Sequence, residues 1–203
     1  MNDIILVLGA WGSGTTAITG VLDRLGAYTC PPHFNTNDPR TLCSYESVDL
    51  RNILLRYINE QDITIIGRRD HLIAELQQWF KYISENKALN NQTIAVKHPL
   101  LSIIVSDLLP ALNPKIITVK RPYEDIERSR IRRKWPAIYG KLGAQQLNNS
   151  ATKSLKKTDA DVLNVPYKEL LKSPDKYILK IAEFCALDND ALKIDNAIDF
   201  IRV

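Results

Sequence analysis

The chain has 203 residues, of which 45% are hydrophobic and 25% are charged, and its formal net charge at pH 7 is +4. These values are typical of an α/β domain with a sizeable core, and no apolar run approaches the length of a membrane-spanning helix. The mild positive charge suits a small anionic ligand and does not by itself indicate nucleic acid as a partner.

The first predicted element is a strand that runs into a glycine-rich loop and then a helix. Residues 4–8 are apolar throughout, and the apolar residues after the loop recur at the spacing of an amphipathic helix: Ile18, Val21, Leu22 and Leu25. The loop at 9–16 follows the Walker A pattern G-x-x-x-x-G-K-[ST], except that Thr15 occupies the position of the lysine. This difference indicates a ligand with a phosphate to hold and argues against an ordinary NTPase.

The glycine-rich loop has the features of a phosphate site. Glycines let the backbone turn tightly, so that several N–H groups converge on one anion, and the following helix adds the positive end of its dipole. We predict that the loop binds a phosphate group through Gly12, Ser13, Gly14, Thr15 and Thr16. The alternative is a strand–turn–helix joint in which the glycines serve turn geometry only.

Strand and helix patterns alternate along the rest of the chain. Apolar and β-branched runs predict strands at 63–66, 93–96, 116–119 and 162–165. Helical periodicity predicts helices at about 50–58, 72–83 and 100–112, from 122 and after 174. We interpret residues 30–45 as a loop and the polar stretch 144–161 as the most mobile segment and a candidate lid.

This alternation predicts an α/β fold, in which a parallel sheet is covered by helices on both faces. Ligands of such folds bind beyond the carboxyl ends of the strands. The glycine-rich loop, Lys97 with His98, and Lys120 with Arg121 all follow predicted strand ends. We therefore expect them to meet at one edge of the sheet, within a single domain that spans residues 1–203.

Arg121 and Ser129 are candidates for a second phosphate site. Arginine offers a planar fork to a phosphate, and Ser129 lies about two turns into the next helix, on nearly the same face as the helix start. The alternative is that Arg121 pairs with Asp125 in the first helical turn. The wider basic cluster is either a solvated helix face or a surface for an anionic partner: Arg121, Arg128, Arg130, Arg132, Arg133 and Lys134. Two phosphate sites at one edge suit a 3′,5′-bisphosphorylated nucleotide and not ATP.

Four segments together resemble the sulfotransferase family, which uses 3′-phosphoadenosine 5′-phosphosulfate (PAPS). The loop at 12–16 resembles the family's 5′-phosphosulfate loop, and Arg121 with Ser129 resembles its 3′-phosphate motif. Residues 37–47 are similar to an acidic stretch of bacterial members, and residues 165–174 to a late strand and a tyrosine-containing turn. These matches span most of the chain.

The resemblance implies a three-layer sandwich with a central, mainly parallel sheet, the P-loop NTPase-like fold of sulfotransferases. It also implies transfer of a sulfuryl group from PAPS to a hydroxyl or amine of a small-molecule or glycan acceptor, with adenosine 3′,5′-bisphosphate (PAP) as the product. Lys97 would offset the charge of the leaving group, and His98 or Glu46 would accept the proton of the acceptor. The alternatives are that His98 caps the next helix and that Glu46 caps the helix beginning near Ser47. The family needs no metal, and the sequence shows no metal-ligand cluster.

The loop departs from the family pattern at Gly12, because members commonly carry lysine or arginine there. A cation from a neighbouring strand end is the expected substitute, and the candidates are Lys97, Lys120, Arg68 and Arg69. Without such a substitute, the chain would bind the nucleotide but turn over slowly or not at all. Two other functions therefore stay open: a degenerate P-loop kinase or NTPase, and a non-catalytic nucleotide-binding protein of the same fold.

The remaining features concern the acceptor and the compartment. We expect the acceptor pocket near residues 30–45 and the basic helix, with Trp11, Trp79 and Trp135 either lining it or packing in the core. The first apolar run is too short for a signal peptide, and the three cysteines lack metal-like spacing: Cys30, Cys43 and Cys185. Both observations favour a cytoplasmic chain with reduced thiols.

Overall fold

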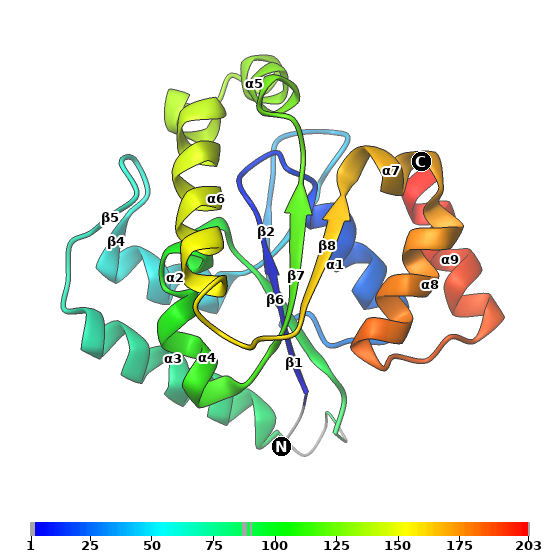
Figure 1. Ribbon diagram of the computed structural model, residues 1–203, viewed down its shortest axis with the longest axis horizontal. Helices are drawn as coiled ribbons and strands as arrows, with labels where there is room; N and C mark the ends of the chain where they lie inside the picture. Colours follow the sequence, from blue (N-terminus) through cyan, green and yellow to red (C-terminus); the bar gives the residue numbers. More distant parts are fainter. Residues whose placement is uncertain (1–2, 87–88, 90, 203) are drawn as a thin grey trace.

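A four-stranded parallel sheet forms the centre of the computed structural model, which describes residues 3–86, 89 and 91–202 (Figure 1). The strands lie in the order β6–β1–β7–β8 and comprise β1 Ile4–Leu8, β6 Ile94–Lys97, β7 Lys115–Lys120 and β8 Val162–Pro166. β1 lies in the middle, and its Ile5 is paired with Ala95 on one side and with Lys115 on the other. Every residue of β1 and β6 is buried, because a parallel sheet is covered on both faces. The predicted α/β architecture is confirmed.

Helices cover both faces of the sheet and complete a three-layer arrangement (Figure 1). One face is covered by α1 Thr15–Arg24, α8 Pro174–Cys185 and α9 Ala191–Arg202. The other is covered by α2 Val48–Tyr57, α3 Arg69–Ser84, α4 Val105–Leu112 and α6 Lys141–Leu155. Successive strand side chains alternate between the faces, so Ile5 and Val7 pack on the α1 side while Leu6 and Leu8 pack on the α2 side.

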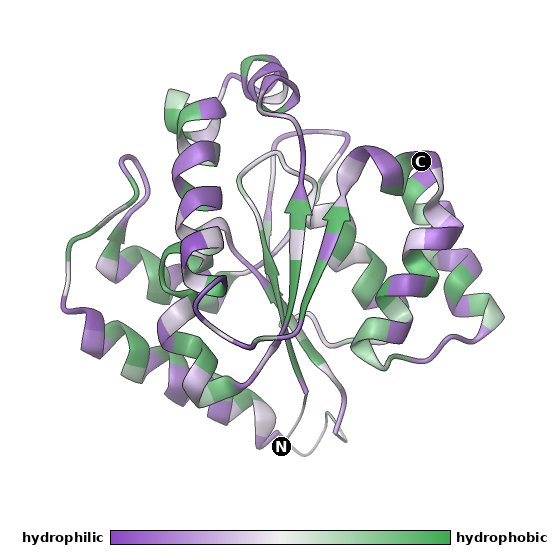
Figure 2. Ribbon diagram, in the orientation of Figure 1, coloured by the Kyte–Doolittle hydropathy of each residue, from purple (hydrophilic) through white to green (hydrophobic). Residues whose placement is uncertain are grey.

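Shorter elements surround this core. The helical ones are η2 Pro99–Ile103, α5 Tyr123–Arg132, η3 Ala137–Tyr139 and α7 Tyr167–Lys172. Two antiparallel pairs join β2 His33–Asn35 to β3 Cys43–Ser47, and β4 Ile58–Asn59 to β5 Thr64–Ile65. α5 lies beyond the carboxyl end of β7 and is largely hydrophilic, whereas the central strands are hydrophobic (Figure 2). In the part of the chain that the structure describes, no helix has both the length and the apolar character needed to cross a membrane.

The prediction of a mobile lid at 144–161 is wrong. Most of this segment belongs to α6, a helix of 15 residues that packs on the core. Ala144, Leu147 and Ala151 are buried at the spacing i, i+3, i+7. Two of these three are alanines, so the polar residues around them conceal the packed face in the sequence.

Several predicted boundaries also need correction. The strand predicted at 63–66 lies outside the central sheet, where residues 64–65 form a hairpin with β4. The predicted loop at 30–45 contains β2 and the start of β3, and the helix predicted at 100–112 is divided between η2 and α4. The last helix, α9, has no counterpart in the prediction. β2 and β4 have only 3 and 2 residues, too few to show a hydrophobic period, which explains why they were missed.

Candidate functional site

A cleft of about 1110 Å³ opens at the carboxyl edge of the sheet. The glycine-rich loop, the β2–β3 hairpin, the ends of β6 and β7, and α5 all contribute to its lining. The predicted site residues that line it are Gly12, Gly14, Thr15, Thr16, Glu46, Lys97, Arg121 and Ser129. Segments far apart in the sequence thus meet at one edge, as expected of ligand sites in parallel sheets.

The loop between β1 and α1 has the backbone of an anion-binding turn. Gly12 and Gly14 have φ angles of 73° and 105°, in the left-handed region that glycine adopts without strain. A Cβ atom at Gly14 would lie 2.2 Å from the ring of Tyr167, so this position has no room for a side chain. No side chain caps the start of α1, and the buried hydroxyl of Ser13 has no hydrogen-bond partner among the described residues. The loop therefore presents uncapped N–H groups at the start of α1, whereas Ser13 is buried and does not line the cleft.

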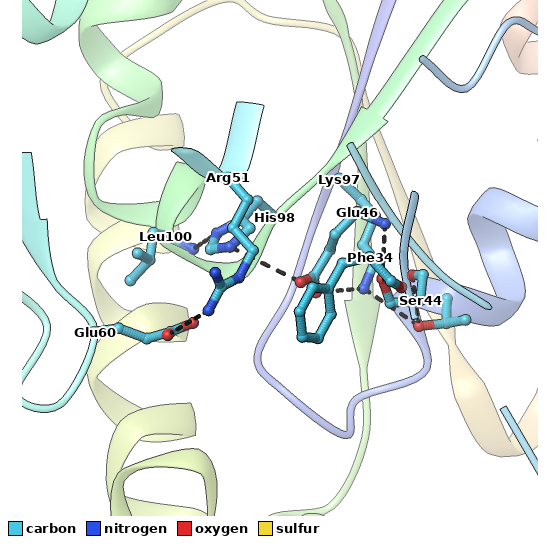
Figure 3. Close-up of polar contacts among 9 residues, drawn as sticks. Phe34, Ser44, Glu46, Arg51, Glu60, Lys97, His98 and Leu100 are labelled. Carbon is cyan, nitrogen blue, oxygen red and sulfur yellow. Dashed lines mark hydrogen bonds and ion pairs between the residues drawn. The ribbon is translucent and has the colours of Figure 1, made fainter. Parts of the chain in front are cut away.

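Lys97 and Glu46 form a buried ion pair beside this loop (Figure 3). The Nζ atom of Lys97 lies 2.8 Å from Oε1 of Glu46, and it donates a second bond of 3.3 Å to Oγ1 of Thr16. Burial alone would raise the pKa of Glu46, but the ammonium of Lys97 holds that pKa below its usual value. Since Lys97 ends β6 and Glu46 lies near the end of β3, two neighbouring segments bring a cation and a carboxylate to the loop.

His98 lies behind Glu46 and does not line the cleft. Its Nδ1 atom accepts a hydrogen bond of 3.2 Å from the N–H of Leu100, so the ring caps η2, which was the alternative to a catalytic role. The Nε2 atom lies 3.9 Å from Oε2 of Glu46 and has no hydrogen-bond partner in the described part of the chain. Burial lowers the pKa of His98 to about 4, so the ring is neutral at neutral pH.

Arg121 lies on the opposite side of the loop from Lys97. Its Nη1 atom donates a hydrogen bond of 2.7 Å to the carbonyl of Gly12. The guanidinium also lies 5.1 Å from the centre of the Tyr167 ring. These contacts hold the arginine against the loop at the mouth of the cleft, with further N–H donors left for a ligand.

Ser129 is brought to the same place by α5. A Cβ atom built on Gly12 would lie 3.7 Å from the Cβ atom of Ser129, whose hydroxyl donates a bond of 3.0 Å to the carbonyl of Asp125. The carboxylate of Asp125 pairs with Arg128 and, at 3.0 Å, with Lys168. Asp125 is therefore not paired with Arg121, which was the alternative interpretation of the sequence.

The carboxyl end of α5 is attached to the β2–β3 loop, residues 36–42. The carboxylate of Asp38 lies 3.1 Å from Nη1 of Arg132 and 2.6 Å from Nε of Arg133. Nη2 of Arg133 also donates a bond of 3.2 Å to Thr41. Part of the basic cluster thus fixes a loop over the cleft.

Of the four cations considered as substitutes for the missing loop lysine, Lys97 alone lines the cleft. Lys120 lines a second cavity of about 460 Å³ that lies beside α6. Arg68 and Arg69, at the start of α3, are engaged in ion pairs with other carboxylates.

The sequence indicated one wall of the cleft only in part, because it offered Trp11 and Trp135 as candidates but not Arg51, Glu60 or Tyr139. This wall combines an ion pair with aromatic rings, and its members are Arg51, Glu60, Tyr139, Trp11 and Trp135. They come from α2, the β4–β5 turn, η3 and two loops, so no sequence spacing links them. Two of the three tryptophans considered for the acceptor pocket therefore line the cleft, whereas Trp79 packs edge-on against Phe80 of the core.

Comparisons with known proteins bear on the fold. No family model matches the chain, and no curated protein matches it in sequence. A sulfotransferase from Mycobacterium tuberculosis matches 98% of this chain over 71% of its own, with a TM-score of 0.68 and 14% identity. The sulfotransferase domain of a Synechococcus olefin synthase matches 95% of this chain over 76% of its own, at a TM-score of 0.60 and 20% identity. A mouse sulfotransferase complexed with PAP matches 98% of this chain over 64% of its own, with a TM-score of 0.52 and 16% identity.

The central parallel sheet, the uncapped loop after β1 and the two helical layers define a three-layer α/β fold. Within this class, the chain has the sulfotransferase fold. A sugar kinase from Janibacter also matches, over 96% of this chain and 98% of its own, at a TM-score of 0.51 and 16% identity.

Proposed function

We propose that residues 1–203 form a single domain that transfers a sulfuryl group from PAPS to a hydroxyl or amine of an acceptor. One observation carries the proposal: Lys97 and Arg121 lie on opposite sides of an uncapped glycine loop and both contact it. A 3′,5′-bisphosphorylated nucleotide has anionic groups at two separate positions, whereas the phosphates of ATP form a single chain. The sulfotransferase fold supports the same assignment.

The residues present suit this nucleotide. The N–H groups of the loop, with the hydroxyl of Thr16, would hold the 5′-phosphosulfate. Arg121 and Ser129 would hold the 3′-phosphate. PAPS supplies the activated sulfuryl group, so the protein has to position the acceptor and to offset the charge that develops on the leaving oxygen.

Lys97 is the cation that we propose for the leaving oxygen, in place of the lysine or arginine that is absent at Gly12. Its ammonium already contacts Thr16 of the loop. A shift of this ammonium towards the leaving oxygen releases Glu46, whose pKa then rises because burial is no longer offset. Glu46 thereby becomes a better general base at the moment when the acceptor hydroxyl loses its proton. We assign this role to Glu46 and not to His98, which lies outside the cleft lining.

Isothermal titration with PAP tests the nucleotide site. We expect Arg121→Ala to weaken PAP binding at least about tenfold, because a charge-assisted contact to phosphate is lost. Arg128→Ala is the matched control, since Arg128 lies on α5, the helix that follows Arg121, has a side chain that is 75% exposed and pairs with Asp125. Equal binding by the wild type and Arg121→Ala would remove the assigned 3′-phosphate site.

Sulfate transfer from labelled PAPS to a broad acceptor panel tests the chemistry. Glu46→Gln is expected to reduce transfer by about 10²–10⁴-fold while PAP affinity stays within about twofold. PAP binding by the wild type without transfer to any acceptor would instead support a non-catalytic nucleotide-binding protein.

A kinase of small molecules is the second candidate, because the Janibacter sugar kinase shares the fold. Thr15 stands against it, since it occupies the position of the lysine in the Walker A pattern. Mg²⁺-dependent binding of ATP that is tighter than binding of PAP would favour the kinase.

A further inference from the structure

One part of the cleft, a compartment beside Glu46, is lined by residues to which we assign no role in holding the nucleotide. Arg51 of α2 and Glu60 of the β4–β5 turn form its polar floor, and Tyr139 of η3 stands beside them. Figure 3 shows Arg51 reaching towards Glu60, with the ring of Phe34 beside its guanidinium. Since this compartment adjoins the candidate base, it is where an acceptor would lie.

Arg51 and Glu60 form a largely buried ion pair. The Nη2 atom of Arg51 lies 3.0 Å from Oε2 of Glu60, and their side chains are 24% and 15% exposed. The ring of Phe34 covers the guanidinium at 4.8 Å. A guanidinium has five N–H donors and a carboxylate has about four acceptor positions, so this contact leaves further donors and acceptors for a ligand.

Aromatic rings lie next to this pair. Tyr139 stacks on Trp11 with ring centres 4.4 Å apart, and it meets Trp135 edge-on at 6.0 Å. Burial and the carboxylate of Glu60, which accepts a hydrogen bond from the hydroxyl of Tyr139, raise the pKa of Tyr139, so the hydroxyl keeps its proton. The compartment thus offers an apolar surface and paired charges side by side.

We propose that the acceptor is a neutral polyhydroxylated compound of the saccharide class, bound between the Arg51–Glu60 pair and the rings of Tyr139 and its neighbours. The inference rests on the proposed function and names its acceptor. Adjacent hydroxyls accept from Arg51 and donate to Glu60, while the C–H face of the sugar ring packs on the aromatic surface. One hydroxyl then faces Glu46.

Other acceptor classes fit this compartment less well. A flat phenol or a hydrocarbon would cover the Arg51–Glu60 pair without replacing the hydrogen bonds that the pair makes to water. An anionic acceptor would have to compete with Glu46 and Glu60 for Lys97 and Arg51, since each of these cations is already paired with a carboxylate. Neutral hydroxyls avoid both penalties.

The test is titration of the PAP-loaded protein with maltose, cellobiose, lactose and trehalose, beside 2-naphthol and glucose 6-phosphate. We expect at least one neutral disaccharide to bind, and Glu60→Gln to weaken that binding about tenfold while PAP affinity is unchanged. Tyr139→Phe is the second variant, because it keeps the stacked ring and removes only the hydroxyl. Glu75→Gln is the matched control, since Glu75 forms an Arg–Glu pair with Arg56 outside the cleft lining.

Each outcome decides the inference separately from the proposed function. Binding of PAP together with binding or sulfation of 2-naphthol alone overturns the saccharide inference and leaves the sulfotransferase intact. The same holds if no disaccharide binds at millimolar concentration, or if Glu75→Gln weakens disaccharide binding as much as Glu60→Gln. Failure of the wild type to bind PAP contradicts the proposed function. Disaccharide binding to that same protein would still support the inference that this part of the cleft binds a saccharide.

Discussion

Lys97 and Glu46 are both almost completely buried, with side chains 4% and 10% exposed, and each compensates the charge of the other. Breaking such a pair leaves one charge in a poorly solvated place, which costs about 3–5 kcal/mol. The free energy of unfolding therefore depends on both residues together, whatever ligand occupies the cleft.

The first prediction concerns this pair. Lys97→Met should lower the free energy of unfolding by about 3–5 kcal/mol, because Glu46 loses its partner. The double variant Lys97→Met with Glu46→Leu should recover most of that loss, since neither charge remains buried. Urea denaturation of the wild type, both single variants and the double variant gives the coupling energy. Additive effects of the two substitutions would show that the pair does not act as a unit.

The second prediction concerns His98 and pH. The pKa of His98 is about 4 in the folded chain and about 6.5 when unfolded, so between these values the unfolded state binds the proton more readily. Stability should therefore fall as the pH is lowered from about 6.5 to about 4, by up to about 3 kcal/mol from this residue. Denaturation midpoints across that range measure the slope.

The control for this titration is His98→Asn, which keeps a side-chain acceptor for the N–H of Leu100 without the ionisable ring. Its stability should depend less on pH in the same window, even if its absolute stability is lower. An unchanged slope would mean that other groups cause the pH dependence.

At the scale of elements, α6 packs its buried side chains into the core on the α2 side of the sheet. Leu147 is 0% exposed, so Leu147→Ala should reduce the free energy of unfolding by about 2–5 kcal/mol. Amide hydrogen exchange should also show strong protection between residues 144 and 155. Fast exchange across this range would instead support the mobile segment that was predicted from the composition.

The attachment of the 36–42 loop to α5 gives a prediction of another kind. Asp38→Asn removes the charge that both Arg132 and Arg133 contact, so the loop should be cleaved faster by a protease. Limited proteolysis followed by mass spectrometry locates the cut. The control is Asp70→Asn, a surface pair with Arg68 that should leave the cleavage rate unchanged.

At the scale of the whole molecule, the three thiols differ in accessibility. Cys30 and Cys185 are 2% and 0% exposed, and burial raises the pKa of both to about 12. Cys43 is partly exposed and lines the cleft. A thiol reagent should therefore modify Cys43 quickly and the other two only as the chain unfolds. Cys43→Ser should abolish the fast phase, and two or three fast equivalents in the wild type would contradict this.

The sequence predicts the central sheet and its ligand edge because both depend on repeated physical patterns. β1, β6 and β7 are apolar runs, and the loop at 9–16 has glycines where left-handed backbone is needed. It does not predict the wall around Arg51 and Tyr139, because tertiary packing alone brings these residues together. It also left the roles of His98 and Glu46 open, because both are buried and only Glu46 lines the cleft, which their spacing in the sequence does not reveal.

The order of the strands has a consequence for any compound that occupies the cleft. β1 separates β6 from β7, and adjacent strands lie about 4.8 Å apart, so the sheet holds β6 and β7 about 10 Å apart. In the register of the sheet, Lys97 is level with Val7 and Ile117, and Arg121 follows Ile117 four residues further along the chain. Lys97 and Arg121 therefore approach the cleft from different strands and at different levels along the strand direction, and a compound that engages both cations has to match this offset.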